Sequence, residues 1–192
     1  MVFLDVGVLA VVLGKLLGGK LGNLGAVSLS AKWLAFAAIG LQIAAFPSNV
    51  LPWSTPTGAA KVLWLASYVL LVSFLVLNRA LRGVLLVAAG VACNLCAILA
   101  NGGLMPVLRS ALAAAGGRYE VHNNSIQLGR PHLAFLVDRW AAPSWVPLAN
   151  VYSVGDVLIG AGVLLTVILV MRNDEAYGEL CSSEPGHVSV RM

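Results

Sequence analysis

Charge is the property that this sequence has least of. Lys and Arg number 12 and Asp and Glu 8, so that only 10% of the 192 residues are charged. Soluble domains carry about a quarter charged residues, and the composition excludes that class. Disorder is excluded as well, because 59% of the residues are hydrophobic and the mean hydropathy is +0.90. Three cysteines are too few for a disulfide framework. A small membrane protein remains.

Long apolar runs define the expected fold. A bilayer core requires about 20 apolar residues per helix, and we predict an all-α, polytopic transmembrane bundle of about five helices. The predicted spans are residues 2–17, 33–51, 62–77, 83–100 and 157–171. Residues 1–171 then form a single transmembrane domain, and residues 172–192 a flexible cytoplasmic tail. Asp5 and Lys15 interrupt the first run near its ends, so four spans are the alternative.

Basic residues predict the orientation. Those that fall on one side of the predicted bundle are Lys15, Lys20, Lys32, Arg79, Arg82 and Arg172. Cytoplasmic loops carry an excess of Lys and Arg, so we expect a multi-pass protein of a bacterial cytoplasmic (inner) membrane with its N-terminus outside and its C-terminus in the cytoplasm. The same placement accounts for the pI of about 9.2, and nucleic acid is not expected as a partner. The expected partners are the lipid bilayer and a lipid, a lipoprotein or another membrane protein.

The segment 101–155 is long for a loop in a compact bundle, and loops of this length are usually functional. We expect it to lie outside the cell and to fold over the last two helices. A short helix is predicted over 107–115, ended by Gly116-Gly117, followed by a β-like patch over 119–128. The apolar side chains expected to be buried are Leu104, Val107, Leu108, Leu133, Phe135, Leu136, Val137, Trp140, Trp145 and Val146.

Several short strings carry a resemblance to a known family. They are Asn94 within an apolar run, Asn101-Gly102-Gly103-Leu104-Met105-Pro106, Leu133 to Asp138, and Asn150 to Asp156. Together they resemble a family of small bacterial multi-pass membrane proteins of unknown function, over most of the chain. The Asn-Gly-Gly-x-Met-Pro string is the most specific piece. The resemblance implies the fold and the position of a site, and it implies no activity.

A second, local resemblance covers about 40 residues. Asp138-Arg139 is followed 18 residues later by Asp156, at the start of the last predicted helix. This is similar to prolipoprotein signal peptidase, an intramembrane aspartyl protease, whose final catalytic aspartate opens its last helix. Its Gly-Asn-x-x-Asp-Arg box is reduced here to Asp-Arg, and its Asn-x-Ala-Asp spacing is broken by an insertion. The resemblance implies that Asp138 and Asp156 are catalytic.

Two carboxylates brought together could perform that chemistry, because one retains a proton while the other activates water. The residues also have a structural interpretation, which the sequence favours. Ser153-Val154-Gly155-Asp156 before an apolar run is typical of a capping box. Asp138 would then pair with Arg139 or Arg130 at the membrane interface.

Further polar residues predict a binding site beside the two aspartates. We assign Asn94, Asn101, Gly102, Gly103, Asn150 and Ser153 to substrate binding. Asn101 and the amides of the two glycines could hold a substrate carbonyl or a headgroup. The alternative is that Gly102-Gly103 ends the helix and that Asn94 bonds to a neighbouring helix.

Cysteine and histidine suggest two further chemistries. Cys93 and Cys96 share one helical face, which is similar to quinone-linked thiol oxidoreductases of the vitamin K epoxide reductase type. His122, His132 and Glu120 match no ligand spacing, so neither a metal nor a cofactor is expected.

Three classes of function follow from these residues. The first is a non-enzymatic binding or assembly protein with an outward-facing polar site. The alternatives are an aspartyl hydrolase that uses Asp138 and Asp156, and a thiol oxidoreductase that uses Cys93 and Cys96. Transport ranks last, because few charged residues lie near the predicted spans.

Overall fold

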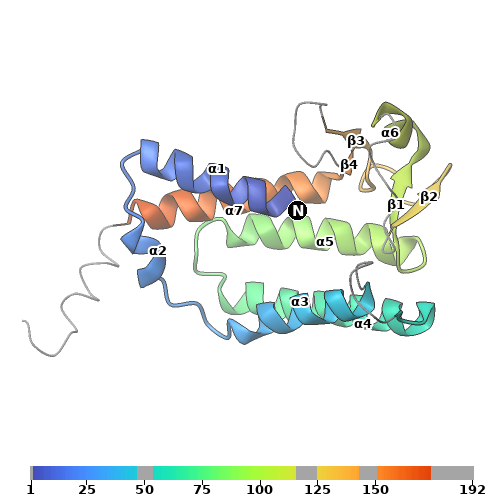
Figure 1. Ribbon diagram of the computed structural model, residues 1–192, viewed down its shortest axis with the longest axis horizontal. Coiled ribbons are helices and arrows are strands. Elements are labelled where there is room, and N and C mark those ends of the chain that lie inside the picture. The colour runs from blue at the N-terminus through green and yellow to red at the C-terminus, as the bar shows by residue number, and fades with distance from the viewer. Residues whose placement is uncertain (1, 47–53, 116–124, 143–150, 174–192) are drawn as a thin grey trace, which may run out of the picture.

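The computed structural model describes residues 2–46, 54–115, 125–142 and 151–173, and its fold is mostly helical (Figure 1). The longer helices are α1 (Val2–Leu16), α3 (Trp33–Ala45), α4 (Thr57–Leu77), α5 (Val84–Ala100) and α7 (Val154–Met171). Two short helices, α2 (Gly22–Ala26) and α6 (Arg109–Ala114), lie in the connections. Each predicted span overlaps one of these helices, and α4 begins five residues before the predicted position 62. The predicted tail lies outside the described residues from position 174 onward.

Two of these helices, α4 with 21 residues and α7 with 18, are long and apolar enough to cross a membrane. The apolar helices α3 and α5 are shorter, and so is the apolar stretch Val6–Leu16 of α1. Helix α3 ends earlier than the predicted limit of 51, since its C-cap Phe46 leaves the helical conformation directly before Pro47. Helix α7 begins three residues before the predicted position 157, because Ser153 caps it there.

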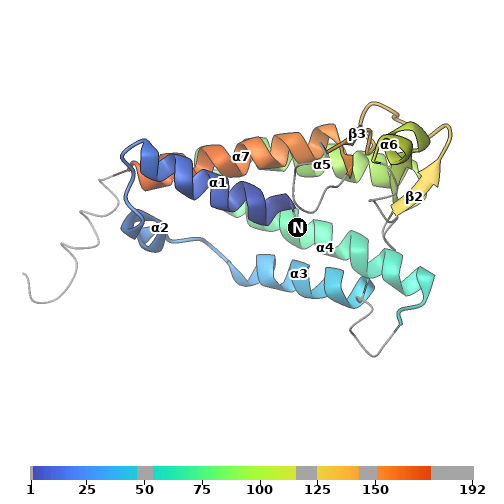
Figure 2. The ribbon, with the colours of Figure 1, turned by 45° about the horizontal axis from the view of Figure 1, so that its top comes forward.

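The long helices form two packed groups. Helices α3 and α4 pair with each other, while α7 lies between α1 and α5 (Figure 2). Glycines bring α5 and α7 close together: a Cβ added at Gly162 would lie 2.7 Å from the backbone nitrogen of Val87, and one at Gly90 would lie 2.8 Å from that of Ile159. Such small residues let two helix backbones approach in a membrane protein.

Short strands gather at one end of the bundle, beyond α5 and beside the start of α7 (Figures 1 and 2). Strand β1 (Met105–Leu108) pairs in parallel with β2 (Ser125–Leu128), and β3 (Trp140–Ala141) pairs antiparallel with β4 (Val151–Tyr152). The predicted helix over 107–115 is therefore wrong in its first turn, because residues 107 and 108 belong to β1. Strand β2 falls in the predicted β-like patch, whose earlier part, up to 124, lies outside the described residues.

The burial expected in this segment is found for one group of residues and not for another. Val107, Leu136 and Val137 are buried, whereas Leu133, Phe135 and Trp140 are 41%, 58% and 47% exposed. The expectation was wrong for these last three, because their side chains lie on the surface of the segment. Trp145 and Val146 lie outside the described residues.

At the opposite end of the bundle, two asparagine side chains form hydrogen bonds to the backbone of segments distant in the sequence. Asn78, the C-cap of α4, donates from Nδ2 to the carbonyl oxygens of Phe74 (2.8 Å) and Ser30 (3.0 Å), and its Oδ1 accepts from the Ser30 N–H (2.9 Å). The buried Asn23 donates to the Met171 carbonyl oxygen at 3.0 Å. The bonds of Asn78 tie the end of α4 to the backbone at Ser30, and the bond of Asn23 reaches a carbonyl group at the C-terminal end of α7, where helical partners are lacking.

Candidate functional site

A capping box opens α7 at the strand-bearing end of the bundle. The Asp156 N–H donates to Ser153 Oγ at 3.0 Å, and the Ser153 N–H donates to Asp156 Oδ2 at 3.0 Å. The two side chains thus satisfy each other's free backbone N–H groups. The carboxylate of Asp156 also lies in the first turn, where the helix dipole favours negative charge.

Asn94 joins this cap to α5. Its Nδ2 donates to Asp156 Oδ1 at 2.9 Å, while Ser153 Oγ lies 2.8 Å from both Asn94 Oδ1 and Asp156 Oδ2. The hydroxyl has a single proton, which serves one of these two acceptors at a time. A side chain at Gly155 would collide with the Asn94 amide, so the glycine makes the contact possible. Asn94 and Ser153 are both buried.

Asp138 is held beside this network by its backbone. Its N–H donates to the Pro106 carbonyl oxygen (3.0 Å), and its own carbonyl oxygen accepts from the Leu108 N–H (2.9 Å), so that it extends the pairing of β1. The side chain is only 7% exposed. Burial, and to a smaller extent the charge of Asp156, raises the pKa of Asp138 to about 8. At neutral pH the group is therefore a protonated carboxylic acid that can donate a hydrogen bond.

Asp138 and Asp156 interact electrostatically without touching. No hydrogen bond joins the two carboxyl groups, and within the described ranges no arginine pairs with Asp138. The guanidinium of Arg139 lies over the ring of Trp140, 5.4 Å from its centroid. One carboxyl group is thus held in a cap, and the other is buried near it.

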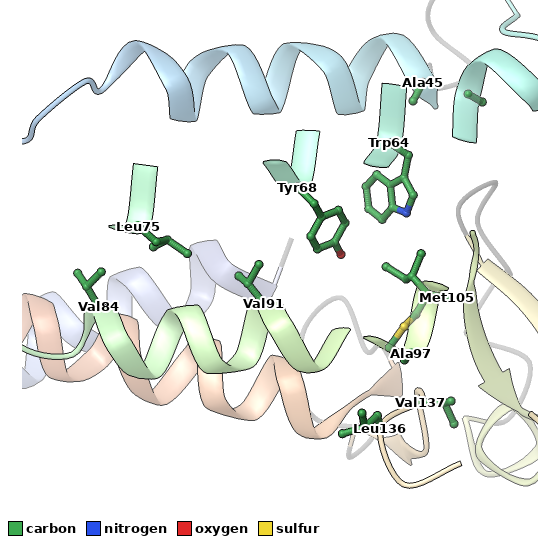
Figure 3. Close-up of a cluster of buried hydrophobic side chains, with 12 residues drawn as sticks. Ala45, Trp64, Tyr68, Leu75, Val84, Val91, Ala97, Met105, Leu136 and Val137 are labelled. Carbon is green, nitrogen blue, oxygen red and sulfur yellow. The ribbon is translucent and has the colours of Figure 1, made fainter. Parts of the chain in front are cut away.

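Two aromatic residues of α4 complete the site, and the sequence analysis did not identify them. Trp64 and Tyr68 are buried and meet edge to face, with ring centroids 5.2 Å apart. Both project toward α5 and β1 in the cluster that also contains Met105 and Val137 (Figure 3). The Tyr68 hydroxyl lies within electrostatic range of Asp138 and Asp156.

The indole N–H of Trp64 has no hydrogen-bond acceptor in the described part of the chain. A buried donor without an acceptor costs about 1–3 kcal/mol, so such a group calls for an explanation. The available sequence signal was a pair of aromatic residues with polar tips, four positions apart in an apolar helix.

Asn101, Gly102 and Gly103 end α5. The Asn101 Nδ2 donates to the carbonyl oxygens of Ala97 (2.8 Å) and His132 (2.9 Å), and its Oδ1 accepts from the His132 N–H (2.8 Å). Gly102 has φ +79° and Gly103 has φ +89°, and the Gly103 N–H donates to the Ile98 carbonyl oxygen at 2.9 Å. This is a Schellman turn, which glycine permits. All three residues serve the helix end in this structure, and Asn150 lies outside the described residues.

The other candidate chemistries involve residues that form none of the hydrogen bonds of the Ser153, Asp156 and Asn94 network. Cys93 is partly buried and Cys96 is exposed, both in α5 and both free thiols. His132 is exposed, while His122 and Glu120 lie outside the described residues. Over the described ranges no group of three or more His, Cys, Asp or Glu side chains could hold a metal ion.

The fold and the site define a class: a mostly helical protein that has two helices long and apolar enough to cross a membrane and whose polar residues meet at one end of its helices. Residues 26–168 match the model of a family described as "Family of unknown function (DUF5317)". The chain belongs to this family. An "Uncharacterized protein" of Thermotoga maritima is 30% identical over 143 residues, which cover 69% of this chain and 76% of that protein. No solved structure matches the chain.

Proposed function

We propose that this chain is a multi-pass protein of the cytoplasmic membrane that binds a partner or a lipid at its polar site and catalyses no reaction. The observation that carries this proposal is the state of Asp156. Both of its oxygens accept hydrogen bonds within the chain, Oδ1 from Asn94 and Oδ2 from Ser153. Asp156 therefore serves as a helix cap. It is not free to activate water, which aspartyl hydrolysis would require of the second carboxylate of the pair.

The arrangement of apolar and basic residues supports a location in the membrane. Large apolar side chains lie exposed on the outer faces of several helices, among them Phe36, Ile39, Val62, Val69 and Leu85. The ends of α1, α4 and α7 and the starts of α3 and α5 lie at the same end of the bundle (Figure 1). The basic residues at this end are Lys15, Lys20, Lys32, Arg79, Arg82 and Arg172. Under the positive-inside rule this end is cytoplasmic, and the polar site faces outward.

Cysteine labelling in whole cells tests the orientation. In a background without native cysteines, Phe135→Cys should react with a membrane-impermeant maleimide, because this exposed position lies three residues before Asp138 in the segment at the proposed outer end. Lys20→Cys should react only after the membrane has been permeabilised. The opposite pattern would reverse the proposed topology.

An aspartyl hydrolase is the second candidate, and one observation favours it. The negative charge of Asp156 contributes to the raised pKa of Asp138, and a carboxyl group whose pKa is raised by a second one nearby is a feature of catalytic aspartate pairs.

Incubation of the purified protein with a lipid-modified, membrane-anchored reporter peptide separates the two candidates. The binding protein should leave the peptide intact. Cleavage by the wild-type protein that is lost in both Asp138→Asn and Asp156→Asn, with both variants still folded, would establish the hydrolase and overturn our proposal.

A further inference from the structure

Three side chains with hydrogen-bond donors lie in or directly beside one core cluster: Trp64 and Tyr68 of α4 belong to it, and Asp138 follows its member Val137. The Trp64 indole N–H is buried and has no acceptor among the described residues. The Tyr68 ring packs against Trp64, and its hydroxyl lies near both aspartates. The Asp138 side chain is buried and carries a proton at neutral pH.

This set of donors selects the chemistry of a ligand. Asp156 is the nearby acceptor, but its oxygens already bond to Asn94 and Ser153. Uncommitted donors in an apolar setting require acceptor atoms, and an uncharged acceptor avoids repulsion from the Asp156 carboxylate. A carbonyl group meets both conditions. A cation is disfavoured at this site, because the N–H and O–H donors present the positive ends of their dipoles to the ligand.

The position of the site indicates where such a carbonyl comes from. Asp138 pairs with β1 at the strand-bearing end of the bundle, two residues before the half-exposed Trp140, a residue type that concentrates at the membrane–water interface. The contact between α4 and α5 is less extensive than those between α3 and α4 or between α5 and α7. An acyl chain has apolar surface on both helices at this seam, including Leu71 and Leu95.

We propose that Trp64, Tyr68 and Asp138 bind the ester carbonyl groups of a diacyl glycerolipid, whose acyl chains lie along the seam between α4 and α5. This inference rests on the proposed function, for which it specifies the ligand. Two ester carbonyls offer four lone pairs, which is enough for three donors. Above pH 8 the Asp138 carboxyl group loses its proton and with it the ability to donate.

A comparison of two phospholipids tests the inference without altering the protein. The purified chain is reconstituted with equal amounts of dioleoyl phosphatidylglycerol and its dioleyl ether analogue, which has the same headgroup and chain length and lacks the carbonyl groups. Native mass spectrometry measures which lipid is retained. The ester lipid should be retained over the ether lipid by about fivefold or more, the ratio that corresponds to one net hydrogen bond. Equal retention would overturn the inference.

Two variants then locate the site. Trp64→Phe and Tyr68→Phe keep an aromatic ring and remove one donor, so each should lower the preference for the ester lipid by about fivefold. Trp33→Phe is the matched control, because Trp33 is 64% exposed on α3, away from the seam, and its replacement should leave the ratio unchanged. A preference that is unchanged in both donor variants places the lipid elsewhere and overturns the inference.

The indole nitrogen gives a second readout that does not depend on the stability of the variants. In protein labelled with 15N-tryptophan, the Trp64 N–H resonance is the one that Trp64→Phe removes. It should differ between nanodiscs of the ester lipid and of the ether lipid, while the Trp33 resonance should coincide. A Trp64 resonance that is identical in both lipids refutes the hydrogen bond. Peptide cleavage that depends on Asp138 would instead overturn the proposed function, whatever the lipid ratio.

Discussion

As the pH rises, the wild-type protein should lose stability relative to the variant Asp138→Asn. The carboxyl group has a pKa of about 8 in the folded chain, against 3.8 as its ordinary value. A group whose folded pKa is raised contributes stability below its unfolded pKa, and this contribution is lost as the pH rises toward the folded pKa. Asn is uncharged at every pH and has no such loss.

The magnitude follows from the difference between the two pKa values. The shift from 3.8 to about 8 spans about four units, and each unit corresponds to about 1.4 kcal/mol. The free energy of unfolding of the wild type should therefore fall relative to that of Asp138→Asn by about 1.4 kcal/mol per pH unit from pH 4 to 8. The full difference, about 5–6 kcal/mol, should be reached near pH 8.

Unfolding in mixed detergent micelles, followed by circular dichroism at several pH values, measures this difference. Infrared spectroscopy supplies an independent readout, because a protonated carboxyl group has a carbonyl stretching band that a carboxylate lacks. The band should persist at pH 7 in the wild type, fall to about half its intensity near pH 8 and be absent from Asp138→Asn. Parallel stability curves for the two proteins between pH 5 and 8, or a band lost below pH 5, would refute the assignment of a buried, neutral Asp138.

Three further predictions concern the elements that build the site. Ser153→Ala should lower the free energy of unfolding by about 1 kcal/mol through loss of the α7 cap, whereas Ser73→Ala, whose hydroxyl bonds within an exposed helical turn, should change it by less than about 0.5 kcal/mol. Gly155→Ala should lower the free energy of unfolding by about 1–3 kcal/mol, because the added methyl group collides with α5. Gly160→Ala, whose added Cβ would have its nearest neighbour 3.7 Å away, should leave the free energy of unfolding nearly unchanged; thermal unfolding measures both. Asn101→Ala should accelerate hydrogen exchange at residues 129–135 about tenfold while leaving α7 protected, and uniform acceleration across the chain would contradict this role.

Local patterns were the part of the structure that the sequence could predict. The capping box of Ser153 and Asp156 depends on residues three positions apart, and the structure contains it. The turn at Gly102-Gly103 likewise depends on adjacent positions that require a positive φ. The apolar runs located all the longer helices, because hydropathy along the chain needs no tertiary information.

Contacts between distant residues were the part that the sequence could not supply. Asn94 lies 62 positions before Asp156, and only the close packing of α5 on α7 brings the two side chains together. The helix predicted over 107–115 includes the last two residues of strand β1, because the partner strand β2 begins at Ser125, beyond α6, and tertiary pairing overrides local preference. The pair of Trp64 and Tyr68 places two polar tips on one face of α4, but only the tertiary structure shows that the Trp64 N–H has no acceptor within the described residues.

The two C-cap asparagines have a consequence for how sequences of this fold can diverge. Asn78 and Asn101 each bond to a carbonyl group one turn back and to both backbone groups of a distant residue, Ser30 in one case and His132 in the other. The distant residue takes part only through its backbone, which every amino acid other than proline supplies in full. Positions 30 and 132 can therefore change freely, whereas positions 78 and 101 need a side chain with a donor and an acceptor, and Asp there would lose the donor. Among relatives that keep these connections, variation should concentrate on one partner of each pair and spare the other.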